Sequence, residues 1–334
     1  MKVKAIGRNG ISAPILSFGS APIGNLLREV SESEAQGAIA AAWESGVRYF
    51  DAAPHYGLGL AERRLGQALS NFSRSEYLLS TKVGRLLEPT SDFPGETDLA
   101  DGFMVPKNFI RNYDYSGDAT KRSIEASLKR IDTDYIDIVY VHDSDNHYEQ
   151  ALNGAFPALS KLRDEGVIKS FGAGMNQSKM LAEFVKHTDL DVVMLAGRYT
   201  LLEQGPLDDL LPLALEKNVS IVAAGVFNSG LLSKNRPTSD STYDYAKAPA
   251  ELIARVNQLA DICESHGTTL PAVAAQFPLG HQAVANICLG ARNREQVLRN
   301  AKLFEEDISV ELWRELGSKG LVRPESVAGF LQGG

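Results

Sequence analysis

Short apolar runs rich in β-branched residues alternate along this chain with longer segments in which apolar residues recur at helical spacing. The runs predict strands, and the amphipathic segments between them predict helices. The predicted strands are residues 13–19, 47–52, 77–84, 135–142, 167–174, 191–197, 219–226 and 284–290. The predicted helices are residues 32–45, 60–70, 118–130, 148–165, 178–187, 207–217, 250–266 and 293–304.

This alternation is typical of an α/β protein built as a parallel (β/α)8 barrel of the TIM type. The near-continuous apolar character of the strands agrees with that prediction, because a parallel sheet is covered on both faces. No segment reads as a linker, so we expect residues 1–334 to form a single barrel domain.

Two long segments interrupt the alternation of predicted strands and helices. They are residues 86–117 after the third predicted strand and residues 227–249 after the seventh. Loops that follow barrel strands lie on the carboxyl-end face, where catalytic loops gather. Aromatic residues in both segments favour folded lids over disordered insertions. They are Phe103, Phe109, Tyr113, Tyr115, Tyr243 and Tyr245.

Composition and charge narrow the classes of function. The net charge of −8, with no basic block, argues against nucleic-acid binding, which depends on neutralising phosphates. The amino terminus lacks the apolar stretch of a secretory signal, and no apolar run approaches the roughly 18 residues of a membrane span. We therefore expect a cytoplasmic protein with no membrane partner. Cys263 and Cys288 lack metal-site spacing and are predicted to be buried packing residues.

Polar side chains stand where three of the predicted strands end. Asp51 ends the second strand, with Tyr56 five residues later, while Lys82 closes the third strand and His142 the fourth. In a closed barrel these strand ends converge, so the four side chains are expected to share one mouth. A lysine that closes an apolar strand needs a carboxylate partner, and Asp51 is the expected one.

Such a group suits proton transfer at a carbonyl or alcohol oxygen. The ordinary tyrosine pKa of about 10 is too high for a base at neutral pH, but a neighbouring ammonium favours the phenolate. We expect Lys82, held by Asp51, to lower the pKa of Tyr56 in this way. His142 would then orient the substrate oxygen, and the polar mouth would stabilise developing alkoxide charge.

In order and strand position, these four residues resemble the Asp, Tyr, Lys and His of the aldo-keto reductase family. The segment "FDAAPHYGLGLAERRLGQAL" is similar to a specific motif of that family, and the resemblance extends over nearly the whole chain. It implies a barrel that holds NADPH or NADH across its mouth without a Rossmann domain. Consistently, the chain contains no G-x-G-x-x-G motif.

The resemblance also implies cofactor contacts. Asn176 matches the family residue that binds the nicotinamide carboxamide, although Met175 stands at the family's serine position. Ala224 stands where the family has an aromatic residue stacked on nicotinamide, and Phe227 is the expected substitute. The other implied contacts are Gly230, Leu231, Gly290, Ala291, Arg292, Gln296 and Asn300.

The choice between NAD and NADP depends on the last strand and helix. The family binds the adenosine phosphate there, with amides at a helix amino terminus as donors. NADPH-dependent members often carry a lysine after the strand and an arginine where Gln296 stands, and this chain has neither. Their absence favours NAD, while Arg292 and Arg294 keep NADP as the alternative.

The segment "LAGRYTLLEQ", the "HD" after the fourth strand and the insertion after the third resemble one branch, the D-threo-aldose 1-dehydrogenases. That resemblance implies oxidation of the anomeric hydroxyl of a sugar such as L-fucose, D-arabinose or L-galactose to the lactone. Pyridoxal 4-dehydrogenase is similar too, and would convert the pyridoxal hemiacetal to 4-pyridoxolactone. Expected substrate contacts are His55, Tyr113, Asp143, Arg198 and Tyr199. Nothing in the sequence indicates the oligomeric state.

Two alternatives belong to other classes. His142, Asp143, Asp145 and His147 lie at spacing suited to a divalent metal of a barrel hydrolase, but the first strand supplies no ligand, and we expect no metal. The second alternative is a cofactor-sensing subunit that does not turn over, as among some aldo-keto reductase relatives. The intact set of four polar residues argues against it.

Overall fold

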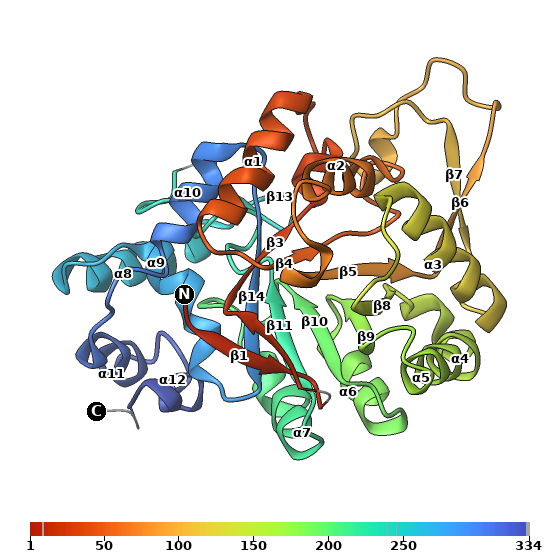
Figure 1. Ribbon diagram of the computed structural model, residues 1–334. Coiled ribbons are helices and arrows are strands. Elements are labelled where there is room, and N and C mark those ends of the chain that lie inside the picture. Colours follow the sequence, from red (N-terminus) through yellow and green to blue (C-terminus); the bar gives the residue numbers. More distant parts are fainter. Residues whose placement is uncertain (9, 239, 245, 332–334) are drawn as a thin grey trace.

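The computed structural model describes residues 1–334 except 9, 239, 245 and 332–334 (Figure 1). Tyr245, one of the predicted lid aromatics, therefore lies outside the described residues. Parallel strands close into a barrel in the order β3-β4-β5-β8-β9-β10-β11-β14, with β14 paired to β3. Their bounds are β3 Leu16–Gly19, β4 Tyr49–Asp51, β5 Leu78–Val83, β8 Ile138–His142, β9 Ser170–Met175, β10 Val192–Ala196, β11 Ser220–Ala224 and β14 Val284–Gly290.

The predicted (β/α)8 barrel is thus confirmed, and one predicted strand needs correction. Residues 13–19 do not form a single strand, because β2 (Ile11–Pro14) ends at Pro14 and β3 begins at Leu16. Proline has no amide hydrogen for a strand ladder, and the chain leaves one sheet and enters the barrel at this point.

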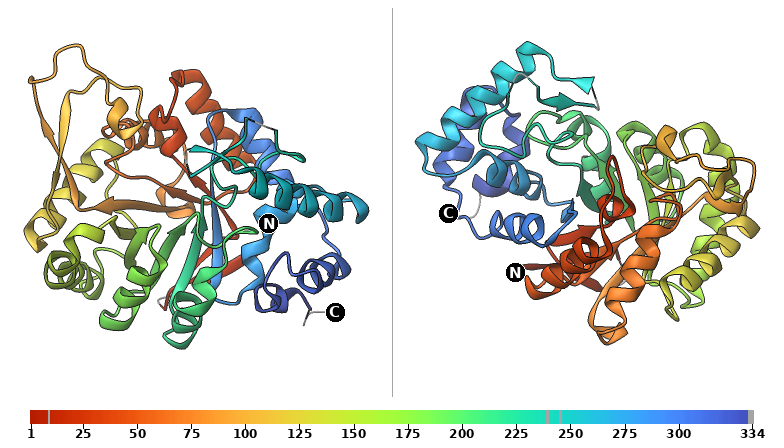
Figure 2. Two further views of the ribbon diagram at one scale, coloured as in Figure 1. Left: turned by 180° about the vertical axis from the view of Figure 1, so that it is seen from behind. Right: turned by 90° about the horizontal axis from the view of Figure 1, so that it is seen from above.

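Helices cover the outside of the barrel (Figures 1 and 2). They are α1 Glu32–Glu44, α2 Leu60–Leu69, α3 Gly117–Ile131, α4 Tyr148–Gln150, α5 Phe156–Asp164, α6 Ser178–His187, α7 Leu210–Glu216, α8 Ala250–Ser265, α9 Leu270–Gln276, α10 Arg294–Lys302, α11 Val310–Ser318 and α12 Pro324–Leu331. A π-helical turn, Ala151–Ala155, joins α4 to α5 within the predicted helix 148–165. Short 3-10 turns are Ala21–Gly24, Arg74–Glu76, Leu99–Asp101, Asp145–His147, Gly205–Asp208 and Phe277–Gly280.

The sequence pattern does not predict three of the described helices, α9, α11 and α12. Helix α9 has an all-apolar buried face, so its sequence lacks amphipathic periodicity. Helices α11 and α12 follow the last barrel strand and pack on each other through Trp313 and Phe330, whose stacked rings lie 4.2 Å apart.

An antiparallel hairpin of β1 (Val3–Ile6) and β2 closes the amino-terminal end of the barrel. Lys4 Nζ donates to the carbonyl of Val284 at 2.9 Å, and the Gly7 amide donates to Ser220 Oγ at 2.8 Å. Both acceptors belong to first residues of barrel strands. The hairpin therefore covers one end of the barrel and leaves the carboxyl end for the site.

Both insertions are folded in the described part of the chain, as the aromatic content predicts. Residues 86–117 carry most of a hairpin of β6 (Arg85–Pro89) and β7 (Phe109–Tyr113), which projects from the barrel at the upper right of Figure 1. We call it the lid hairpin. Residues 227–249 carry the short pair β12 (Thr242–Tyr243) and β13 (Ala246–Lys247).

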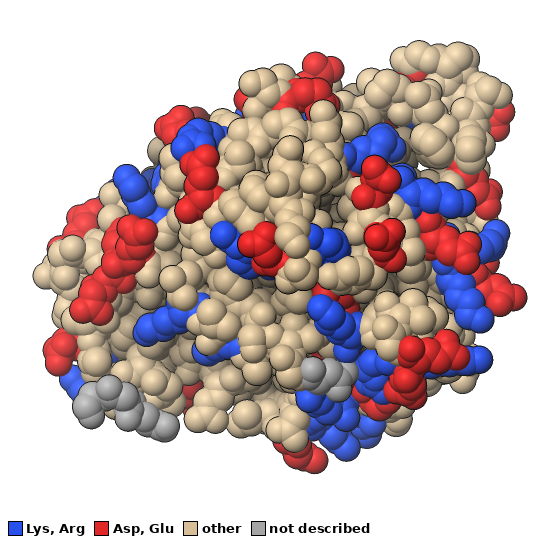
Figure 3. All heavy atoms as spheres, viewed as in Figure 1, with Lys and Arg blue, Asp and Glu red and all other residues tan. Residues whose placement is uncertain are grey.

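The remaining expectations that were drawn from the composition concern the cysteines, membrane spans and the distribution of charge. Cys263 and Cys288 are free and buried, as predicted. Among the described residues, no helix is both long enough and apolar enough to cross a membrane. Acidic and basic side chains are interspersed over the face seen in Figure 3.

Gly66 offers a test of how closely the outer helices pack. A Cβ on Gly66 of α2 would lie 1.9 Å from the carbonyl oxygen of Ile131. We expect Gly66→Ala to lower the free energy of unfolding by about 1–3 kcal/mol or more, measured by chemical denaturation. Gly37→Ala in α1 is the control, because its Cβ would meet only Arg294 Cβ at 3.9 Å. Equal effects of the two substitutions would contradict the close approach.

Candidate active site

The register of the barrel strands brings the predicted polar residues to one rim. Asp51 pairs with Gly19 of β3 on one side and with Ser80 of β5 on the other. His142 ends β8 beside Gly174 of β9. A cleft of about 380 Å³ opens at this rim. Its lining includes His55, Tyr56, Lys82, Phe103, His142, Asp143 and Asn176.

A buried ion pair forms the floor of this cleft. Lys82 Nζ lies 2.6 Å from Asp51 Oδ2 and donates to the carbonyl of Ala52 at 2.9 Å. Ser80 Oγ donates to the second carboxylate oxygen of Asp51 at 2.7 Å. Lys82 and Asp51 are each 2% exposed. Burial is the largest single influence and lowers the pKa of Lys82, but the charges and hydrogen bonds of Asp51 and Tyr56 together outweigh it and raise that pKa, so the ammonium stays charged.

Tyr56 lies against this ammonium. Lys82 Nζ is 4.7 Å from the centre of the Tyr56 ring, and the Tyr56 and His142 ring centres are 5.9 Å apart. Burial raises the pKa of Tyr56 to about 12, although Lys82 lowers it. Lys82 thus acts in the predicted direction, but the predicted net lowering is wrong because removal from water costs the phenolate more. The phenol is therefore mostly protonated at neutral pH.

Two neutral histidines flank Tyr56. Burial, followed by the charges of Arg85 and Lys82, holds the pKa of His142 well below its usual range. Burial, Arg85, Arg111 and Lys82 together lower the pKa of His55 to about 2. The two imidazole centres lie 5.7 Å apart. Both rings therefore meet a substrate in the uncharged form, each with one donor and one acceptor nitrogen.

Residues of the lid hairpin and the turn after it hold the loop behind His142. Arg85 donates to Asp143 Oδ2 at 2.5 Å. The hydroxyl of Tyr115 donates to the carbonyls of His142 at 2.6 Å and Asp143 at 2.9 Å. Asp143 has a φ of +40°, a left-handed conformation that these contacts maintain.

Sequence reasoning missed Arg85, Arg111 and Tyr115 as parts of the site. Arg111 bonds His55, which lies 56 residues away, and Tyr115 bonds His142, 27 residues away. Contacts between residues so far apart in the sequence leave no periodic pattern of hydrophobic and polar positions. The available signal was the presence of arginines and aromatics in the insertion that follows a strand ending in a lysine.

The predicted adenosine-phosphate segment lies on the same rim, because Gly290 of β14 pairs with Gly19. Asn293 caps α10 by accepting the Gln296 amide hydrogen, and Gln296 Oε1 accepts from the Arg292 amide at 2.9 Å. Ala291 is buried, and Asn300 Nδ2 lies 3.4 Å from the carbonyl of Gly290.

Arg292 has the chemistry of an anion ligand. Its guanidinium donates to the carbonyl of Leu26 at 3.1 Å, while its buried Nε has no protein partner within the described ranges. Burial, then the charge of Arg28, lowers its pKa, so a second guanidinium lies nearby. This rim therefore fits a phosphate-bearing cofactor.

The residues at the end of β11 and after it are less accessible to a cofactor than the sequence predicts. Ala224 ends β11 at the rim, paired with Ala196 and Cys288. Phe227 is half-buried against the core, and Gly230 has a φ of +93° in the following turn. Leu231 has a buried side chain and its amide donates to the carbonyl of Asn228, and its contact with the cofactor stays a prediction.

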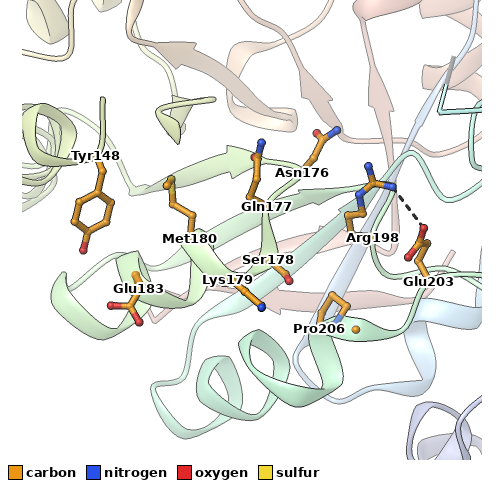
Figure 4. Close-up of a pocket in the computed structure, with 11 residues that line it drawn as sticks. Tyr148, Asn176, Gln177, Ser178, Lys179, Met180, Glu183, Arg198, Glu203 and Pro206 are labelled. Atoms are coloured by element: carbon orange, nitrogen blue, oxygen red, sulfur yellow. Dashed lines mark ion pairs between the residues drawn. The ribbon is translucent and has the colours of Figure 1, made fainter. Parts of the chain in front are cut away.

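A second groove of about 870 Å³ adjoins the cleft and shares Asn176 with it (Figure 4). Arg198 lines this groove, held by Glu203 at 3.5 Å and Asp244 at 3.0 Å. Arg198 therefore lies in the adjoining groove rather than in the cleft, and its contact with substrate stays a prediction.

Two further predicted substrate contacts also lie away from the cleft. Tyr199 is 1% exposed, and its ring centre lies 5.5 Å from that of Phe277 in the core. Tyr113 stands on β7, 44% exposed, and stacks on His147 at 6.0 Å. Among the five residues predicted to contact substrate, His55 and Asp143 line the cleft.

The alternative of a metal site finds no geometric support. Across the described ranges, no three His, Cys, Asp or Glu side chains are grouped to hold an ion. Asp143 is paired with Arg85, and the ring of His147 stacks on Tyr115 at 5.1 Å.

Comparisons with known proteins agree with this geometry. A sequence model of the Aldo/keto reductase family matches residues 15–320. A D-threo-aldose 1-dehydrogenase of a Pseudomonas species is 43% identical, over 94% of this chain and 96% of that protein. Pyridoxal 4-dehydrogenase of Microbacterium luteolum is 42% identical, over 96% and 97%. The holo form of an aldo-keto reductase from Bacillus halodurans is 26% identical with a TM-score of 0.76, covering 97% of each chain.

The buried ion pair predicts a double-mutant result. Asp51→Asn leaves the Lys82 ammonium buried without its carboxylate, so we expect the free energy of unfolding to fall by about 3–5 kcal/mol. Adding Lys82→Met removes the unpaired charge and should restore much of that loss, as measured by chemical denaturation.

Glu264→Gln, at an exposed pair with Arg236, is the matched control and should change stability little. Additive losses in the Asp51→Asn/Lys82→Met protein would refute the coupling of the two charges.

Proposed function

The chain belongs to the aldo/keto reductase family, and we propose that it oxidises the ring hemiacetal hydroxyl of an aldose to the lactone with NAD(P)+. The observation that carries this proposal is one cleft in which Tyr56 meets a buried Lys82–Asp51 pair and the neutral His142. The 43% identical D-threo-aldose 1-dehydrogenase supports the substrate class, with L-fucose, D-arabinose and L-galactose as candidates.

In the proposed mechanism Tyr56 accepts the proton of the substrate hydroxyl. The ammonium of Lys82 stabilises the phenolate that Tyr56 needs for this step, and Asp51 keeps that ammonium in place. His142 orients the reacting oxygen by a hydrogen bond. NAD(P)+ held at the rim, by residues such as Arg292 and Asn176, would supply the acceptor for the hydride of the carbon that bears this hydroxyl. The carbon is thereby oxidised by two electrons, from hemiacetal to ester.

We propose NAD as the preferred cofactor. The side chain of Gln296 is engaged by the Arg292 amide and offers no positive charge to a 2'-phosphate. Arg294 is paired with Glu44, its guanidinium 2.6 Å from the carboxylate. Arg292, whose Nε has no partner among the described residues, remains for a phosphate of either cofactor, while its neighbour Arg28 is itself paired with Glu34 at 3.4 Å.

A second candidate substrate is pyridoxal in its hemiacetal form. The 42% identical pyridoxal 4-dehydrogenase favours it, and the reacting carbon again carries a hydroxyl and a hydride. The same groups would act on it, and the product would be 4-pyridoxolactone.

A panel of substrates tests the proposal. We expect the near-ultraviolet absorbance of reduced cofactor to rise with L-fucose, D-arabinose or L-galactose, faster with NAD+ than with NADP+. A rise with pyridoxal alone would select the second candidate, and no rise with any of the four would contradict both. The control is Tyr56→Phe, which should abolish turnover while cofactor affinity, measured by fluorescence titration, stays near that of the unmodified protein.

The pKa of about 12 at Tyr56 predicts a pH dependence with opposite behaviour in the two directions. Oxidation needs the phenolate, whose fraction grows about tenfold per pH unit below that pKa, so kcat/KM for oxidation should rise steadily from about pH 6 to about pH 10. Reduction of the lactone needs the phenol, which predominates throughout, so its profile should stay flat. His55 and His142, with lowered pKa values, add no ionisation there. A bell-shaped oxidation profile centred near neutrality would refute Tyr56 as the base.

A further inference from the structure

The proposed reaction leaves one residue of the cleft without a role, the second histidine, His55. Its ring lies edge-on to Phe103 at 5.2 Å, with ring centres 6.1 Å from Tyr56 and 5.7 Å from His142. His55 therefore borders the place where the reacting oxygen would sit, on the side toward Phe103.

Arg111 of the lid hairpin donates two hydrogen bonds to His55. Its Nε donates to His55 Nδ1 at 2.7 Å, and a terminal nitrogen donates to the His55 carbonyl at 3.1 Å. The same guanidinium binds both carboxylate oxygens of Asp98, at 2.8 and 2.5 Å, and Asp101 at 2.8 Å. The Arg111 side chain is only 5% exposed. A bidentate carboxylate and a buried position fix this guanidinium in place.

This contact decides which nitrogen of His55 carries the proton. A guanidinium is always a donor, so Nδ1 must be the acceptor and the hydrogen must be on Nε2. Adding a proton to Nδ1 would set a cation against Arg111, in line with the lowered pKa of His55. No hydrogen bond from Nε2 occurs within the part of the chain that the structure describes. His55 thus presents a fixed donor in the cleft.

We propose that His55 Nε2–H binds an oxygen on the carbon next to the reacting carbon, and that Arg111 is the positioning residue that sets this donor. The inference rests on the proposed function, since Tyr56 and His142 hold the reacting oxygen. A substrate without the neighbouring oxygen leaves the half-buried donor of His55 unpaired, and such a site disfavours the deoxy analogue. His55 is therefore a determinant of substrate specificity.

The test compares D-arabinose with 2-deoxy-D-ribose, which lacks only the 2-hydroxyl of D-arabinose, in the unmodified protein and two His55 variants. His55→Asn places an oxygen near the position of Nδ1, so it keeps a partner for Arg111 but lacks a donor at the position of Nε2. His55→Gln carries its amide nitrogen near the Nε2 position. Because Arg111 and its carboxylates stay intact, both variants keep the buried ion pairs.

We expect the unmodified protein to favour D-arabinose over 2-deoxy-D-ribose by about 10- to 100-fold in kcat/KM. His55→Asn should lose most of that preference by losing activity on D-arabinose alone, and His55→Gln should keep more of it. A preference that survives in His55→Asn, or an equal loss on both sugars, would overturn the specificity role. Absence of turnover of L-fucose, D-arabinose, L-galactose and pyridoxal alike by the unmodified protein would instead overturn the proposed function.

A measurement independent of turnover tests the tautomer. In ¹⁵N spectra of the histidine-labelled protein, the resonances absent from His55→Asn identify His55. We expect a protonated Nε2, an unprotonated Nδ1, and no titration around the usual histidine pKa of about 6.5. A proton on Nδ1, or a ring that titrates in this range, would contradict the proposal that Arg111 fixes the tautomer of His55, whichever substrate the enzyme oxidises.

Discussion

The structure of the barrel mouth depends on one constraint, that the ammonium of Lys82 is buried and must be neutralised where it lies. A charge removed from water is tolerated only when a counter-charge and further acceptors surround it. Asp51 and the Ala52 carbonyl meet that requirement, and Ser80 satisfies the remaining carboxylate oxygen. These groups belong to β4, β5 and the residue that follows β4. The parallel register of two adjacent strands therefore determines the electrostatics of the site.

Burial and the cations around the cleft together set the protonation of the other groups. Burial, followed by the charges of Arg85, Arg111 and Lys82, disfavours a proton on His55. Burial and positive charge act in opposite directions on Tyr56, and burial is the stronger effect. The cleft therefore holds neutral donors around a fixed ammonium, an arrangement that suits an oxygen gaining negative charge.

The lid hairpin completes this arrangement from outside the barrel. Arg85 and Arg111 stand on its two strands, and each is paired with buried or half-buried carboxylates. Through them the hairpin contacts the loop after β4 and the loop after β8 at once. An insertion that covers the mouth thereby also orients the groups inside it, so substrate specificity and lid packing depend on the same contacts.

The sequence by itself determined the barrel and the four residues of the proposed catalytic group, because strand and helix periods are local and polar residues that end strands must share a rim. Tertiary structure alone decided the lid contacts, since Arg111 meets His55 across 56 residues. It also decided that Tyr199 points into the core and that Arg198 is held by Asp244. The balance of burial against charge at Tyr56 depends on all the atoms packed around the ring, which no local pattern of residues contains.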